Sequence, residues 1–305
     1  MSDTTASLRR KIDSAGDLQS VVRTMKALAA SSIGQYEQSV LALSDYYRVV
    51  ELGLCVCLRE MEQGAMRPEQ KGRAAQNAIG AIVFGSDQGL VGQFNEVIAD
   101  YAIKTLATLS GNLQVWAVGE RVHARLADAN LPLTGLFAVP NSVKAITPLV
   151  GQILVESETL PSPSDTFRTN QVEATELHLF YNRPTADAIY EPVSQRLLPL
   201  DENWQRKLSE LPWPTGNLPE VIGGGTATLR ALISEYLFVS LFRACAESLA
   251  SENASRLAAM ERADKNIDEL LENFHATFHR LRQSGIDEEL FDVISGYEAL
   301  AKGKK

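Results

Sequence analysis

Residues 36–61, YEQSVLALSDYYRVVELGLCVCLREM, carry the pattern on which the fold prediction rests. Apolar side chains recur there at alternating steps of four and three residues: Tyr36, Val40, Leu43, Tyr47, Val50, Leu54, Cys57 and Met61. This spacing is the a/d seam of a coiled-coil helix. The first proline of the chain is Pro68, so no helix-breaking residue interrupts the stretch. A long amphipathic helix is therefore predicted.

The stripe continues toward the N-terminus. One seven-residue series is formed by Leu8, Ala15, Val22 and Ala29. A second series, Leu18 and Met25, reaches Ile33 only after a slip of one residue, which predicts a local change of phase in the coiled coil. The helix is expected to run from about residue 5 to residue 62.

The C-terminal end of the chain has a matching stripe. It consists of Leu257, Met260, Ile267, Leu271, Phe274, Phe278 and Leu281, with Asp264 as a polar interruption. After Gly285 it resumes with Ile286, Leu290, Val293, Tyr297 and Leu300, and Ser284-Gly285 is expected to mark a kink or a register shift. Exposed a/d stripes must be buried, so the two ends of the chain are predicted to pair as an antiparallel coiled coil.

The middle of the chain has a different pattern and contains all 12 prolines, between Pro68 and Pro219. Strands are expected at 78–84, 113–118 and 133–139, alternating with helices at 94–109, 120–129 and 143–160. Two further strands are expected at 176–181 and 189–198. Alternating strands and helices are typical of a parallel sheet. The predicted fold is α/β with long helices, divided into an N-terminal coiled-coil helix (1–66), a central Rossmann-like α/β domain (75–200), a connector (201–225) and a C-terminal coiled-coil helix (226–305).

Composition excludes several classes of protein. The 305 residues include 29 Lys and Arg against 38 Asp and Glu, a net charge of −9, which argues against nucleic-acid binding. Three cysteines form no disulfide framework and favour a reducing compartment. No secretory signal is recognisable, and Arg243 and Glu247 interrupt the most apolar stretch, Leu237–Ala250, so no membrane span is expected.

No pattern in the sequence specifies a self-contained active site. The segment 85–92, GSDQGLVG, follows a strand as a dinucleotide fingerprint would, but its glycines do not have the G-x-G-x-x-G spacing, so a tight turn is favoured. His275 and His279 lack the glutamate of H-E-x-x-H. Cys55 and Cys57 point about 200° apart on a helix, which favours buried structural thiols. No cofactor, metal or catalytic residue is predicted.

Four segments, in the same order along the chain, resemble the gamma subunit of F-type ATP synthases. Residues 24–32, TMKALAASS, resemble the family's T-K-A-M-K-M-V-A-A-S-K, and 86–95, SDQGLVGQFN, resemble S-D-R-G-L-C-G-G-L-N. Residues 234–256, SEYLFVSLFRACAESLASENASR, closely follow S-E-Y-L-Y-V-S-L-Y-Q-A-x-A-E-S-L-A-S-E-H-A-A-R. Residues 282–290, RQSGIDEEL, with 294–296, ISG, are similar to R-Q-A-S-I-T-Q-E-L and I-V-S-G.

The resemblance implies a non-catalytic rotor subunit, which couples ion flow through a membrane sector to ATP synthesis or hydrolysis. Its implied partners are three alpha and three beta subunits, the epsilon subunit and the membrane c-ring, at the cytoplasmic side of a bacterial plasma membrane. The residues that match the family's rotor–stator contact positions are Met25, Lys26, Arg256, Arg282, Gln283 and Glu289. Asp287 stands where the family has threonine, Val91 where it has the turn cysteine and Gln93 where it has the turn's second glycine, which suggests a divergent branch.

Two alternatives stay open at this point. A coiled-coil scaffold or tether would have the same seam without the Arg282, Gln283 and Glu289 pattern. An enzyme that uses a dinucleotide would bind it through the central domain.

Overall fold

The computed structural model describes residues 4–63, 78–157, 176–186, 188–210, 213–217, 219 and 225–302. The chain divides into two compact units, one made of residues 1–29 with 257–305 and the other of residues 30–256. This division cuts through both terminal helices. The four-part domain division made from the sequence stays a prediction.

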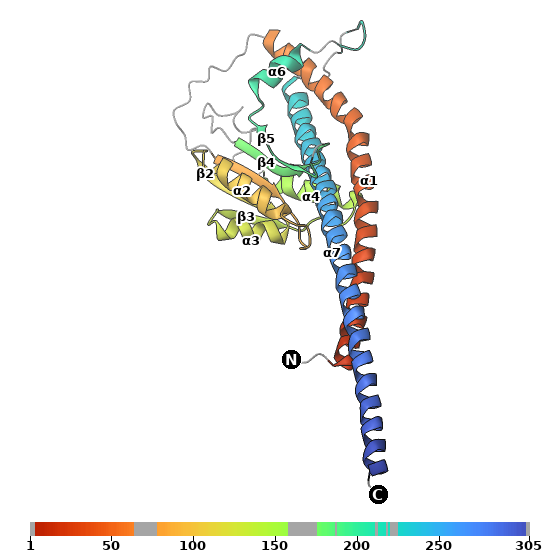
Figure 1. Cartoon of the computed structure of the whole chain (residues 1–305). Helices are drawn as coiled ribbons and strands as arrows, with labels where there is room; N and C mark the ends of the chain where they lie inside the picture. The colour runs from red at the N-terminus through yellow and green to blue at the C-terminus, as the bar shows by residue number, and fades with distance from the viewer. Residues whose placement is uncertain are drawn as a thin grey trace. The chain divides into compact units, whose positions relative to one another are not determined.

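Helix α1 (Thr5–Gln63) and helix α7 (Gly225–Lys302) are long and continuous, and within each unit they run side by side in opposite directions (Figure 1). In the unit of residues 30–256, Tyr46 and Tyr47 of α1 meet Glu235 and Tyr236 of α7. In the other unit, Lys11 lies over the ring of Phe274 and Lys26 lies beside Glu261. The predicted antiparallel pairing is confirmed.

The seam predicted for α1 is largely confirmed by burial. The described seam residues from Tyr36 to Cys57 are buried or half-buried, and so are Leu8, Ala15, Val22 and Ala29. The prediction that Leu18 belongs to the buried seam is wrong, because Leu18 is exposed and its neighbour Gln19 is buried. Helix α7 continues through Ser284 and Gly285, so the predicted kink or register shift there does not end the helix and stays a prediction.

A five-stranded sheet with the order β3-β2-β1-β4-β5 lies in the unit of residues 30–256. Strands β1 (Ala78–Phe84), β2 (Asn112–Val118), β3 (Leu133–Phe137) and β4 (Glu176–Arg183) are parallel, and β5 (Glu191–Leu198) pairs antiparallel with β4. Helices α2 (Phe94–Leu106), α3 (Glu120–Asp128) and α4 (Val143–Ser157) connect the first four strands. The predicted alternation of strands and helices is confirmed.

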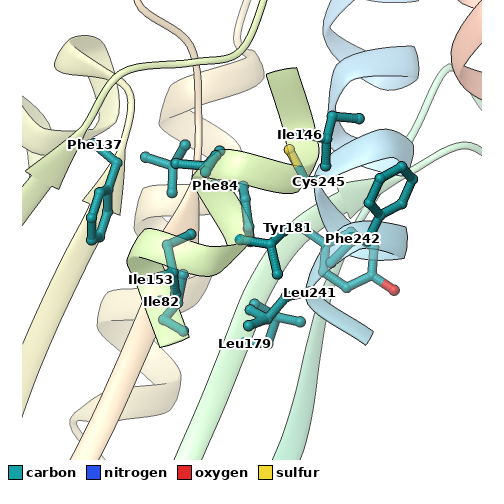
Figure 2. Packing of buried hydrophobic residues seen from close by; sticks show 14 of the residues in the cluster. Ile82, Phe84, Phe137, Ile146, Ile153, Leu179, Tyr181, Leu241, Phe242 and Cys245 are labelled. Carbon is teal, nitrogen blue, oxygen red and sulfur yellow. The ribbon is translucent and has the colours of Figure 1, made fainter. Parts of the chain in front are cut away.

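Both faces of the sheet are covered, because side chains alternate along each strand. In β1, Ala81 and Val83 pack with α2 and α3, whereas Ile82 and Phe84 pack on the opposite face with α4 and α7. Ile146 and Ile153 of α4 belong to one cluster with Leu241, Phe242 and Cys245 of α7 on this second face, and Figure 2 shows Ile146 near Cys245 and Ile153 beside Ile82. Helix α7 is therefore part of the core of the α/β domain.

The segment predicted as an irregular connector contains a short helix, α6 (Glu202–Ser209). The carboxylate of Asp201 caps it by accepting a hydrogen bond from the backbone N–H of Trp204 at 3.1 Å. Trp204 and Leu208 then pack against Leu229 and Tyr236 of α7. Cys55 and Cys57 belong to the same cluster and are buried, as predicted.

Candidate functional site

Met25 and Lys26 lie where α1 and α7 pair in the unit of residues 1–29 and 257–305. Met25 packs beside the small apolar cluster of Val22, Met260 and Ile267. The Nζ atom of Lys26 lies 3.5 Å from a carboxylate oxygen of Glu261, and both side chains are substantially exposed. Neither side chain is fully engaged within the chain, so both have surface available to another protein.

A polar layer crosses the helix pair next to Lys26. The buried amide of Gln19 donates hydrogen bonds to Asp264, at 3.3 Å, and to Asp268. The guanidinium of Arg23 lies 3.1 Å from Asp264 and 3.6 Å from Asp268. A buried polar group at a coiled-coil seam position fixes the register, because any shift leaves it without its partners.

The side chain of Arg256 forms an ion pair within the chain. Its Nη2 atom lies 2.6 Å from Oε1 of Glu252, and its side chain is 13% exposed against 7% for that of Glu252. Burial raises the pKa of the Glu252 carboxyl, and the charge of Arg256 opposes this shift. The carboxylate of Asp87, in the turn after β1, adds to the rise in the pKa of Glu252. Arg256 thus holds a buried carboxylate in the α/β domain.

Arg282, Gln283 and Glu289 lie on the exposed end of α7, where every described residue from 282 to 295 is exposed. Large apolar side chains are exposed there too, including Leu290 at 57% and Phe291 at 69%. The antiparallel pairing explains this exposure: Phe274 already lies at Lys11, and α1 begins at Thr5. The expectation that Ile286, Leu290 and Val293 would be buried against the other end of the chain is therefore wrong, and the side chains of Tyr297 and Leu300 lie outside the described residues.

The six predicted contact residues thus lie at three places. Met25 and Lys26 lie beside the polar layer, Arg256 lies in the unit of residues 30–256, and the remaining three lie on the exposed end of α7. Sequence reasoning missed Gln19. It also missed Ser251 and Ser255 of α7, which are hydrogen-bonded to the α/β domain.

The turn after β1 is held by hydrogen bonds among its own residues and to the next helix. The side chain of Asn95 accepts from the backbone N–H of Ser86 at 2.9 Å and donates to its hydroxyl at 2.8 Å. A Cβ atom on Gly85 would lie 2.4 Å from that of Val122, so the close approach of α3 requires glycine there. Leu90 and Gly92 both have positive φ, as a tight turn requires.

The charge at this turn disfavours a phosphate ligand. The carboxylate of Asp87 accepts hydrogen bonds from the backbone N–H groups of Glu120, at 3.0 Å, and Val139, at 2.9 Å. It therefore lies at the N-terminus of α3, a position that favours an anion. A pyrophosphate would meet the negative charge of Asp87 here, so the arrangement favours a structural turn over a dinucleotide site.

Among the residues that the structure describes, no group of three or more His, Cys, Asp or Glu side chains is arranged to hold a metal ion. Within those same ranges, no helix is both long and apolar enough to cross a membrane.

Solved structures share this fold. A chain of the Euglena gracilis mitochondrial ATP synthase, in the OSCP/F1/c-ring assembly at rotational state 3, matches with a TM-score of 0.63 and 16% identity, covering 99% of this chain and 96% of that chain. A chain of the same organism's rotor in rotational state 1 matches with a TM-score of 0.60 and 17% identity, over 92% and 98% of the two chains. The chain therefore has the fold of those two chains, with two long antiparallel helices and an α/β domain.

Sequence comparison identifies the family. The family model described as ATP synthase matches residues 4–300. A relative from Nocardioides sp., an ATP synthase gamma chain, is 27% identical over 96% of this chain and 95% of its own length. An ATP synthase gamma chain from Salinibacter ruber is also 27% identical, over 96% and 97%. The chain belongs to the ATP synthase family.

Proposed function

We propose that this chain is the central-stalk rotor, the gamma subunit, of an F-type ATP synthase. In this role it couples ion flow through the membrane sector to ATP synthesis or hydrolysis. The proposal rests on the family match and on the exposed end of α7. This end is helical, it bears Ile286, Leu290 and Phe291, and α1 does not extend to it. Exposed apolar side chains on a helix that lacks its own partner fit a surface that other proteins enclose.

The proposed partners are three alpha and three beta subunits around the helix pair, with the epsilon subunit and the c-ring at the α/β domain. The matched chains come from assemblies that include F1, the c-ring and the rotor, which supports the alpha, beta and c-ring assignments. The chain is peripheral to the membrane in this proposal. Its proposed location is the cytoplasmic face of a bacterial plasma membrane.

The proposed mechanism is mechanical and assigns the ATP chemistry to the surrounding subunits. The two helices of the pair have different sequences, so its surface differs from one side to another; Lys26, for example, lies on α1 and Glu261 lies on α7. Three otherwise equivalent beta subunits therefore make different contacts with it. Each orientation favours a different nucleotide state, because contact free energy that differs between states shifts their populations.

Individual residues have different proposed roles. Met25, Lys26, Arg282, Gln283 and Glu289 have surface available for contact with the surrounding subunits. Arg256 was assigned the same role from the resemblance, but its ion pair with Glu252 supports a role inside the α/β domain. For contact with a beta subunit, its guanidinium would have to leave this carboxylate.

Co-expression with the alpha and beta subunits of the same source tests the proposal. A complex with three alpha chains, three beta chains and one copy of this chain is expected, with ATPase activity that depends on this chain. Hydrogen exchange at residues 282–295 should be slower in the complex than in the free chain, because enclosure removes their backbone from water. A chain that purifies alone, with unchanged exchange at these residues, would favour the scaffold alternative.

A further inference from the structure

A row of four polar residues on α7 lies beside the sheet, and three of the four are buried. Arg243, Glu247, Ser251 and Ser255 follow one another at four-residue intervals, the spacing of a ridge on a helix. Glu247, Ser251 and Ser255 are all buried, in a stretch of α7 whose other buried side chains are mostly apolar. We call these four residues the polar row. Buried polar groups in an apolar helix face need a structural reason, because burial without hydrogen bonds is costly.

The two serines bind the α/β domain through its backbone. The hydroxyl of Ser251 donates to the carbonyl of Asn182 in β4 at 3.0 Å. One helical turn further on, the hydroxyl of Ser255 donates to the carbonyl of Val91, in the turn after β1, at 2.5 Å. The side-chain amide of Asn182 in turn donates to the carbonyl of Phe94, at the start of α2, at 3.0 Å. The row therefore reaches both a central strand and the turn beside it.

The first two residues of the row extend the same contact. The Nε atom of Arg243 donates to Glu247 at 2.7 Å, and Glu247 also interacts with the hydroxyl of Tyr181 in β4. Figure 2 shows Tyr181 among the side chains that join the sheet to α7. Arg243 stands where the related gamma-subunit motif has glutamine, so this chain adds a charge pair to the row.

Apolar packing and hydrogen bonds resist sliding in different ways. Burial of apolar area is non-directional, so a helix in an apolar groove can turn or shift with little loss of buried area. Hydrogen bonds depend steeply on distance and angle, and a buried donor that loses its acceptor also pays for desolvation. A shaft attached to its domain by packing alone would therefore resist twisting less than one that is also hydrogen-bonded.

We propose that the polar row fixes the angular position of α7 on the sheet, so that torque applied to the α/β domain reaches the helix pair without slippage. Ser251 and Ser255 are the positioning residues, and Glu247 with Tyr181 supports them. The inference rests on the proposed rotor function, in which the α/β domain and the helix pair are attached to different partners. The row contributes no group to ATP chemistry.

Single-molecule rotation of the assembled complex tests the proposal. The described cysteines of the chain, Cys55, Cys57 and Cys245, are buried, so an exposed Lys104→Cys on α2 provides a selective site for a bead. The alpha and beta subunits are fixed to the surface, and the angle of the bead is recorded during pauses between steps. The variants are Ser251→Ala with Ser255→Ala, and the matched control is Ser248→Ala. Ser248 is similarly buried on the same helix, at 3% exposure against 0% for Ser251 and 6% for Ser255, but it lies outside the polar row.

The angular variance of the bead should be about twofold larger in complexes with the double variant than in complexes with the unsubstituted chain, because two directional hydrogen bonds are lost. The control should show no change. A variance in the double variant equal to that of the control would overturn the proposal. If the double variant fails to assemble, the single variants Ser255→Ala and Tyr181→Phe are each compared with the Ser248→Ala control in the same assay. Assembled complexes in which the bead never rotates would contradict the proposed function itself, a result distinct from unchanged variance.

Discussion

Two parts of the same helix differ completely in their surroundings. From Ser240 to Arg256, α7 is packed into the core of the α/β domain, and Leu241, Cys245 and Ala246 are almost wholly buried. From Arg282 to Ser295, every residue is exposed, although leucine, isoleucine, phenylalanine and valine recur there. Helical periodicity therefore shows which face of a helix is apolar, but it does not show what covers that face. The first part is held by its own chain, and the second part has apolar surface that other proteins can cover.

The largest expected effect is the difference in stability between alanine variants of two leucines on α7. Leu241→Ala removes a side chain with 0% exposure, which should lower the free energy of unfolding by about 2–5 kcal/mol. Leu290→Ala, on the exposed end of the same helix, should change it by less than about 0.5 kcal/mol in the free chain. Urea denaturation followed by circular dichroism measures both. Equal losses would mean that residue 290 is buried in the free chain.

Alanine substitutions at two glycines compare the packed domain with the exposed end of α7 in the same way. Gly85→Ala should destabilise the free chain by about 1–3 kcal/mol, because the added methyl group would lie 2.4 Å from Cβ of Val122. Gly285→Ala should stabilise α7 by up to about 1 kcal/mol, since nothing lies within 4 Å of the added atom and alanine is the better helix former. Thermal unfolding of the two variants should shift in opposite directions. A stabilising Gly85→Ala would contradict the close packing of α3 on the turn.

The exposed end should affect activity more than stability. Arg282→Ala with Gln283→Ala should reduce ATP hydrolysis by the assembled complex about threefold to tenfold, as for the loss of an interface contact worth about 1 kcal/mol. The melting temperature of the free chain should not change, because both side chains are exposed. Steady-state ATPase assays on complexes of verified composition measure the first effect. Unchanged turnover would remove these two residues from the proposed contact.

The smallest effect concerns Lys26 and Glu261. Their charged atoms are 3.5 Å apart, and their side chains are 37% and 51% exposed, so water and salt screen the pair. A double-mutant cycle on the free chain should give a coupling energy below about 1 kcal/mol. A much larger coupling would indicate that Lys26 has a structural role within the helix pair and is not available for an external contact.

The sequence predicted the regular elements well because their signals are local. The strand at 78–84 has the predicted bounds, and the first long helix ends one residue beyond the predicted end. Helix α6 was missed because it is short and has few apolar side chains, Trp204 and Leu208 among them, so it shows no sustained periodicity. Its capping residue, Asp201, was the available signal.

Other differences arise from long-range pairing, which a single periodic pattern does not contain. Leu18 fits the heptad pattern, but Gln19 is buried instead because Asp264 and Asp268 supply its hydrogen-bond partners from the other helix. The stripe after Gly285 is exposed because α1 begins at Thr5. The polar row was visible as small or charged residues every fourth position in an apolar helix, but its acceptors lie in two distant segments of the chain.

Rotation of the assembled complex tests the central claim most directly. With the alpha and beta subunits fixed to a surface and a bead attached at Lys104→Cys, ATP should drive the bead in one direction in three equal steps per turn. A complex that hydrolyses ATP at full rate while the bead remains at a fixed angle would contradict the account, because the chain would then be a static component.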